Sequence, residues 1–234
     1  MNGDHMKTGQ MKNGMTLNRR RLLETIGATA LTTGAVGAFM FRGSPVSLVS
    51  EAMAQTVEQL MEPQALPDMA IGKEDAPVTI VEYASMTCPH CARFHENTFP
   101  GIKEKYVDTG KVRFIFREFP FDPRAAAAFM LARCAPAEQY FPMIDVLFKQ
   151  QKVWAVAEDP RPPLLQISKL AGFTQETFEA CLKNQQVLDN VMAVREKAAK
   201  DYKVDSTPTF FINGEKLSGE MSVDAMSAAI DKHL

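Results

Sequence analysis

The pattern of apolar and polar positions predicts a strand, a helix and a second strand within residues 78–117. β-branched and aliphatic residues dominate Val78–Ala84, as they do in buried strands. A second strand-like run covers residues 112–117. Because a helical segment separates the two runs, we expect the two strands to be parallel. The helix is indicated by apolar or weakly polar side chains at helical spacing, namely Cys91, Phe94, Thr98, Ile102 and Tyr106.

The spacing then stays helical from residue 122 to residue 202 and becomes strand-like again near the end of the chain. Asp122-Pro123 begins an Ala-rich helix, and further amphipathic segments follow it. Residues 209–212 and 215–218 form a predicted hairpin, because the Asn213-Gly214 pair between them is a strong turn signal. Ser222 caps a terminal helix. The element order is therefore strand, helix, strand, helical insertion, strand, strand, helix, which indicates an α/β fold.

The first 54 residues have the features of an export signal rather than of a folded domain. An Arg19-Arg20-Arg21 run precedes a weakly apolar stretch at residues 22–41, in the manner of a twin-arginine signal. Ala52-Met53-Ala54 supplies a small-x-small site, so we expect cleavage after Ala54. The alternative is an uncleaved membrane anchor at residues 22–41, since about 20 residues can span a bilayer. Both alternatives place the remainder of the chain in an oxidising, extracytoplasmic space, and we expect the periplasm.

Charge is unevenly spread along the chain and leaves no basic patch after the signal. Residues 1–54 carry six Lys and Arg against three Asp and Glu, whereas residues 55–234 carry 20 against 25. Binding to nucleic acid requires clustered positive charge. We therefore expect no nucleic-acid partner.

The strongest chemical signal is Cys88-Pro89-His90-Cys91, which lies between the first predicted strand and helix. Two intervening residues allow the sulfurs to close a disulfide. The first sulfur lies at a helix N-terminus, where free N–H groups and the helix dipole favour a thiolate. Pro89 suits the first helical position, and a protonated His90 would stabilise the thiolate further. Half of a zinc site, with His95 on the same helix, is the alternative, but such sites need further ligands at close spacing, so we expect no metal.

These elements and motifs resemble the DsbA-type thiol-disulfide oxidoreductases, which have a thioredoxin fold (βαβ…ββα) with an all-helical insertion between its two halves. The resemblance covers roughly residues 70–232 and is carried by the strand leading into the two-Cys turn, the insertion and the segment 207–214. It implies that Cys88 is the attacking thiolate and Cys91 the resolving one. It also implies a cis Thr207–Pro208 bond beside Cys88, which would present the backbone of Thr207 to an extended substrate peptide.

The resemblance implies domain boundaries as well. Residues 77–121 and 203–234 would form the thioredoxin-like domain, and residues 122–202 the helical insertion. Residues 55–76, which include Pro63 and Pro67, are expected to be a loosely held leader.

Two further residues are candidates for tuning the redox chemistry. Glu82 shares an otherwise apolar strand face and matches an acidic residue of the family thought to mediate proton exchange with the resolving cysteine. The alternative for Glu82 is a strand-edge carboxylate that reaches water. Thr207 replaces the aliphatic residue of the best-known oxidase of the family, and its hydroxyl can hydrogen bond to a cysteine sulfur. Because of this difference, the resemblance does not determine the reduction potential of the Cys88–Cys91 pair.

Cys134 and Cys181 fall in two different predicted helices of the insertion, 47 residues apart. Four cysteines allow three pairings, and one of these joins Cys88 to Cys91 and Cys134 to Cys181. We expect the Cys134–Cys181 bond to be a structural disulfide, because the compartment is oxidising. A regulatory disulfide and two buried free thiols are the alternatives.

The expected function is that of an exported, monomeric enzyme without a cofactor that donates disulfides to reduced, unfolded secreted proteins. A membrane redox partner would reoxidise it. One alternative keeps the fold and reverses the electron flow, giving a disulfide isomerase or reductase. The other is a non-enzymatic chaperone in which the helical insertion holds peptides.

Overall fold

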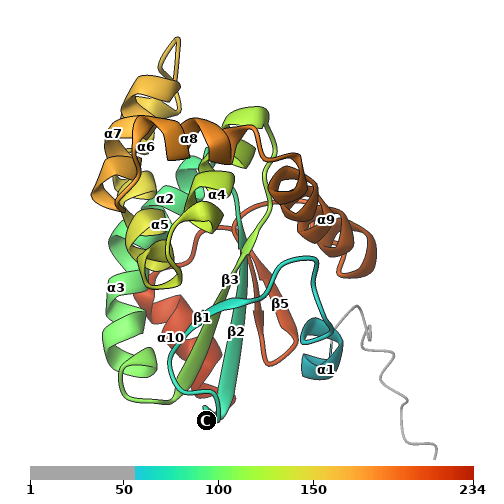
Figure 1. Ribbon diagram of the computed structural model, residues 1–234. Helices are drawn as coiled ribbons and strands as arrows, with labels where there is room; N and C mark the ends of the chain where they lie inside the picture. The colour runs from blue at the N-terminus through green and yellow to red at the C-terminus, as the bar shows by residue number, and fades with distance from the viewer. Residues whose placement is uncertain (1–55) are drawn as a thin grey trace, which may run out of the picture. The chain divides into compact units, whose positions relative to one another are not determined.

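The computed structural model describes residues 56–234, so the predicted export signal and its cleavage site lie outside the described residues. The centre of the fold is a five-stranded sheet in the order β1-β3-β2-β4-β5 (Figure 1). Strands β2 and β3 are parallel, as predicted from the helix between them, and the other pairs are antiparallel. The strands are β1 (Met69–Ile71), β2 (Val78–Ala84), β3 (Val112–Glu118), β4 (Thr209–Ile212) and β5 (Glu215–Ser218).

The hairpin between β4 and β5 turns at the predicted dipeptide. Asn213 and Gly214 have φ angles of 44° and 91°, in the left-handed region that Asn and Gly tolerate best. This turn fixes the register in which Phe210 faces Leu217 across the hairpin.

One continuous helical segment follows β2, and its predicted apolar face is buried. Two wider π-helical stretches interrupt the α-helical turns of this segment, and such stretches are frequent at functional sites. Its parts are α2 (Pro89–Arg93), η1 (Phe94–Thr98), α3 (Phe99–Ile102) and η2 (Lys103–Val107).

The helical insertion begins at the predicted cap, because the Asp122 side chain accepts hydrogen bonds from two backbone N–H groups of the first turn. Thr174 and Ser222 cap two later helices in the same way. The insertion contains α4 (Pro123–Cys134), η3 (Ala137–Gln139), α5 (Tyr140–Lys149), α6 (Gln151–Trp154), α7 (Arg161–Leu170), α8 (Gln175–Leu182) and α9 (Gln185–Asp201), and α10 (Val223–Asp231) follows β5.

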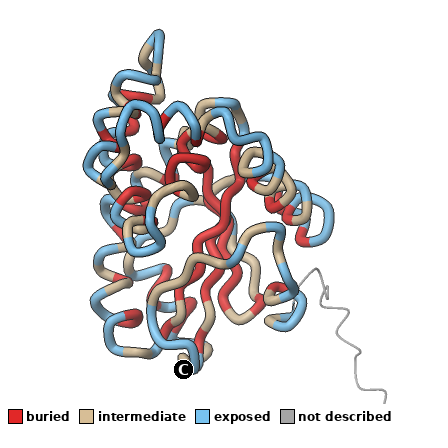
Figure 2. Tube along the Cα trace, in the orientation of Figure 1, coloured by how far each residue is buried: buried red, intermediate tan, exposed pale blue. Residues whose placement is uncertain are grey.

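The sheet separates two hydrophobic clusters, because successive strand residues point to opposite faces. Figure 2 shows buried residues along the central strands. In β2, Ile80 belongs to the larger cluster, which packs against the helices of the insertion and α10. Val81 belongs to the smaller cluster, which packs against α9 and α1 (Val57–Leu60). Figure 1 shows α9 and α1 on the side of the sheet opposite α3 and α10. Glu82 therefore points into the larger cluster.

The expectation of a loosely held leader at residues 55–76 is wrong. Within it, α1 packs on the sheet and β1 pairs with β3, so the sheet begins before the predicted boundary at residue 77. Buried Arg117 of β3 fastens the segment by donating hydrogen bonds to Asp68 Oδ1 at 2.7 Å and to the Leu60 carbonyl at 2.6 Å. These contacts are not predictable from the sequence, because a three-residue strand is too short to show an alternating pattern and one buried Arg produces no periodicity.

Replacing Arg117 by Met should lower the free energy of unfolding by about 3 kcal/mol, because removing one partner of a buried ion pair leaves the other unpaired. Chemical denaturation measures this loss. The control is Arg113→Met on the same strand, whose side chain is only partly buried. Equal losses in the two variants would show that Arg117 does not fasten the N-terminal segment.

Candidate active site

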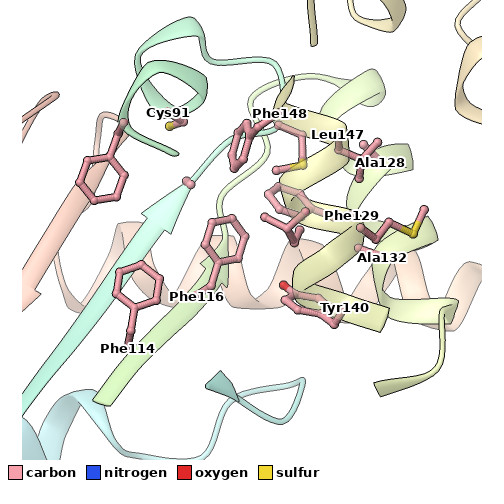
Figure 3. Packing of buried hydrophobic residues seen from close by; sticks show 14 of the residues in the cluster. Cys91, Phe114, Phe116, Ala128, Phe129, Ala132, Tyr140, Leu147 and Phe148 are labelled. Carbon is pink, nitrogen blue, oxygen red and sulfur yellow. The ribbon is translucent and has the colours of Figure 1, made fainter. Parts of the chain in front are cut away.

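The two cysteines of the turn lie at the point where β2 ends and α2 begins. Cys88 is the N-cap of α2, Pro89 is at the first helical turn, and both thiols are reduced in this structure. Cys88 is partly exposed, whereas Cys91 is fully buried. Figure 3 shows Cys91 at the edge of the aromatic core near Phe148. One thiol is thus accessible to another molecule and the other is not.

The surroundings of Cys88 favour its thiolate and lower the pKa of this thiol from 9.0 to about 5. The largest cause is a hydrogen bond from the Cys91 thiol, against which partial burial acts. The Thr207 side chain and the backbone N–H groups of Cys91 and His90 lower the pKa further. The Thr207 hydroxyl is buried and has no hydrogen-bond partner among the described residues.

The surroundings of Cys91 favour its thiol over its thiolate. Burial raises the pKa of its thiol well above the ordinary value, and the hydrogen bond to Cys88 and the negative charge of Glu82 raise it further. At neutral pH the pair therefore holds a thiolate at Cys88 and a thiol at Cys91, which is the division of roles expected from the sequence.

The loop before β4 completes the surface beside the turn. The Thr207–Pro208 peptide bond is cis, and Cys88 Sγ lies 3.3 Å from the Thr207 carbonyl oxygen. The carbonyl accepts a hydrogen bond from Cys88 when the sulfur is protonated. This segment and the turn are 119 residues apart in the chain.

Two insertion residues that sequence reasoning missed hold the turn in place. Gln151 Nε2 donates to the carbonyl oxygens of Met86 at 2.8 Å and Cys88 at 3.0 Å. Thr87 Oγ1 donates to Asp122, the cap of α4. The helical insertion is therefore part of the active-site scaffold, and no local sequence signal identifies either contact.

The His90 ring faces a carboxylate rather than the sulfur. Its Nδ1 lies 3.2 Å from Glu220 Oε2 and 2.6 Å from an Arg93 guanidinium nitrogen. The backbone N–H of His90 is among the groups that lower the Cys88 pKa. Stabilisation of the thiolate by a protonated His90 ring stays a prediction.

Replacing Glu220 by Gln should lower the Cys88 pKa and raise the reduction potential, because Arg93 loses its anionic partner and its positive charge is no longer offset near the thiolate. Thiolate absorbance against pH and equilibration with glutathione measure the two quantities. Glu96→Gln makes the same charge change at an exposed position of the same helical segment. If both variants shift equally, the effect is one of net charge rather than of the Arg93–Glu220 pair.

Glu82 is fully buried in the core, as its strand face predicted, and does not reach water at the strand edge. Its Oε2 lies 2.8 Å from His95 Nε2 of η1, and its Oε1 has no hydrogen-bond partner among the described residues. His95 is also buried. No feature of the sequence indicates that these two residues pair.

The other two cysteines form a disulfide between α4 and α8. The Cys134–Cys181 bond has an S–S distance of 2.16 Å and a Cα–Cα distance of 6.1 Å, and it spans 47 residues. This bond excludes the alternative of two buried free thiols in the structure.

Within residues 56–234, no three His, Cys, Asp or Glu side chains come together in a way that could hold a metal ion. None of the helices in this part of the chain is long and apolar enough to cross a membrane.

Comparison with known proteins agrees with this geometry. A thioredoxin family model matches residues 64–232. A Rickettsia bellii relative whose name describes a protein-disulfide oxidoreductase is 34% identical over 195 residues, which cover 80% of this chain and 75% of the relative. The crystal structure of Wolbachia pipientis alpha-DsbA1 is 35% identical and has a TM-score of 0.68, with 76% of this chain and 95% of that chain covered.

The structure of oxidised BdbD from Bacillus subtilis is 23% identical, with a TM-score of 0.65 over 71% of this chain and 92% of that one, and supports the fold alone. Together, the fold and the two-Cys turn define an enzyme that exchanges thiols and disulfides with substrate proteins. The chain belongs to the thioredoxin family and is a DsbA-type thiol-disulfide oxidoreductase.

Proposed function

We propose that the protein acts as an oxidase, which is exported to the periplasm and introduces disulfides into reduced, unfolded secreted proteins. The observation that carries this proposal is the Cys88 pKa of about 5 beside a buried Cys91. A stabilised thiolate favours the reduced enzyme, and this makes the enzyme's disulfide a stronger oxidant. The twin-arginine-like signal supports export.

The exposure of the two sulfurs sets the order of the exchange steps. A substrate thiolate attacks Cys88 Sγ, the Cys88–Cys91 bond breaks, and its electron pair goes to Cys91 Sγ, which takes up a proton. A second substrate thiolate then attacks the substrate sulfur of the mixed disulfide. Cys88 leaves as a thiolate, and two electrons have moved from the substrate to the enzyme. The low Cys88 pKa makes it a good leaving group in this second step.

The backbone beside Cys88 supports binding of an extended peptide. Pocket-lining residues His90, Thr207 and Glu220 border a depression next to the turn. We propose that the substrate segment carrying the reactive cysteine lies here and pairs with the backbone at Thr207 in the manner of an added strand. A membrane-bound, quinone-linked oxidase would then remove the two electrons from the reduced pair.

Equilibration of the Cys88–Cys91 pair with glutathione tests the direction of electron flow. A reduction potential more positive than about −180 mV, the value of protein disulfide isomerase, would support the oxidase. A value near about −270 mV, as in thioredoxin, would contradict it and support a reductase. The Thr207 side chain, which is among the groups that lower the Cys88 pKa, is the observation that keeps a disulfide isomerase as the second candidate.

A further inference from the structure

The buried pair Glu82–His95 lies on the same side of the sheet as Cys91. Cys91 and His95 are four residues apart and both are buried on the inner side of their helical segment. Glu82, on the neighbouring strand, acts on Cys91 electrostatically and binds His95 Nε2 at 2.8 Å. Its second oxygen is a buried acceptor without a partner among residues 56–234. The pair thus combines a free acceptor near Cys91 with a basic ring further away.

His95 connects this pair to the molecular surface. Its ring stacks on Phe148 with a centroid distance of 4.5 Å and meets Phe116 edge-on, and these contacts fix its orientation. The ring also lines a pocket of about 350 Å³ between α3 and α5, with Phe99 and Phe141 in its walls. The π-helical stretch η1 places His95 between the core and this pocket. The pocket does not include the turn or the proposed peptide site.

We propose that His95, acting through Glu82, carries protons between Cys91 and the solvent in this pocket. The inference rests on the proposed thiol-disulfide exchange, in which Cys91 changes its protonation state in every cycle. When the Cys88–Cys91 bond breaks, His95 takes a proton from solvent and passes it to the Glu82 carboxylate. Glu82 then passes this proton to the electron pair on Cys91 Sγ. Reoxidation of the enzyme reverses each transfer.

Such a route separates proton transfer from substrate binding. The front of the turn is covered when a peptide is bound at Cys88, and the buried Cys91 has no surface of its own. A path through the rear pocket remains open throughout the exchange. His95 is on this account a positioning and relay residue, because it touches Glu82 rather than the reacting sulfurs.

Several titratable groups face His95 and influence the pH dependence of the relay rate. Glu82 on β2 and Cys91 on α2 face it from the core. Lys103 of η2 and Asp145 of α5 line the same pocket at its exposed side. Tyr140 of α5 lies within electrostatic range of Glu82, so its variants are not suitable controls.

Rapid mixing of the reduced, full-length protein with dithiobis-nitrobenzoate separates the two cysteines. Cys88 attacks the reagent and releases the first nitrothiobenzoate, and Cys91 then loses its proton, attacks Cys88 Sγ and releases the second. His95→Gln retains a hydrogen-bond donor for Glu82 without a titratable ring. We expect the second phase to slow about tenfold or more and the first to change by less than about twofold. An unchanged second phase overturns the relay.

His95→Ala offers a rescue experiment, because it leaves a space that opens into the pocket. Added imidazole should restore the second phase in His95→Ala, whereas pyrrole, a ring of similar size without a basic nitrogen, should not. Imidazole should have no effect in Glu82→Gln, in which the next group of the path is lost. Equal rescue by pyrrole would mean that the ring only fills space, and it would overturn the proposal.

A measurement on the unaltered protein keeps the test independent of folding defects in the variants. Proton transfer through His95 predicts a slower second phase in deuterium oxide. An equal or faster second phase in deuterium oxide contradicts the relay, since a simple thiol pre-equilibrium needs no transfer in the rate-limiting step. Loss of the first phase in the unaltered protein would instead contradict the proposed function, because that phase depends on Cys88 alone.

Discussion

The reduced protein will have a larger free energy of unfolding than the oxidised protein at about pH 7, by roughly 2–3 kcal/mol when solvent screening of the partly exposed Cys88 sulfur is allowed for. The cause is the Cys88 pKa, which is about 5 in the folded protein against 9.0 for the free group. A depressed pKa adds stability that is complete above the unfolded value and is lost as the pH falls through the folded value. The advantage should therefore decrease from about pH 9 and disappear below about pH 5.

Denaturant unfolding of both redox forms between about pH 4 and pH 8 measures this difference. Higher pH is avoided because the raised pKa of buried Cys91 acts in the opposite direction there. Cys88→Ser removes the titrating thiol and should abolish the pH-dependent part in the reduced state. A reduced form that is equally or less stable than the oxidised form at neutral pH would contradict the oxidase proposal, because the redox equilibrium and the two stabilities are thermodynamically linked.

The elements that were predicted correctly have strong local signals. The uninterrupted β-branched run gives β2 its observed bounds, Val78–Ala84. Asn213-Gly214 determines the hairpin, and the caps Asp122 and Thr174 mark where helices begin. The parallel pairing of β2 and β3 follows from the intervening helix alone. These features depend on neighbours within a few residues, which a single sequence displays directly.

The contacts that were missed join distant parts of the chain. His90 and Glu220 are 130 residues apart, and Gln151 binds the Met86 carbonyl across 65 residues. Burial of Glu82 could be predicted from the period of its strand, but its partner His95 could not. Helical periodicity shows which face of a helix is buried, but it does not show which residue a side chain on that face contacts. The resemblance to the DsbA-type enzymes identified the chemistry of the turn.

The two-Cys turn contains one feature that the sequence predicts and one that it does not. The position of Cys88 at a helix N-terminus follows from the sequence. The orientation of the His90 ring does not, because Arg93 and Glu220 compete for it. Residue type alone does not show which neighbours a side chain contacts.

Replacing both Cys134 and Cys181 by Ala should lower the free energy of unfolding by about 4 kcal/mol and leave oxidation of a reduced peptide within about twofold of the parent rate. The loss follows from the 47-residue loop that the bond closes, whose conformational entropy returns to the unfolded chain when the bond is absent. Activity should persist because the bond joins α4 to α8, whereas the turn is held by Gln151 and by the cap of α4.

The two single variants make this prediction specific to the cross-link. Cys134→Ala and Cys181→Ala each break the same bond, so each should lose nearly as much stability as the double variant, and the three losses should be strongly non-additive. Additive losses would show that the side chains act through separate packing contacts. A double variant that is as stable as the parent but inactive would contradict the structural role and make Cys134–Cys181 a redox element that communicates with Cys88. Denaturant unfolding and peptide oxidation, measured on the same four proteins, decide between these roles.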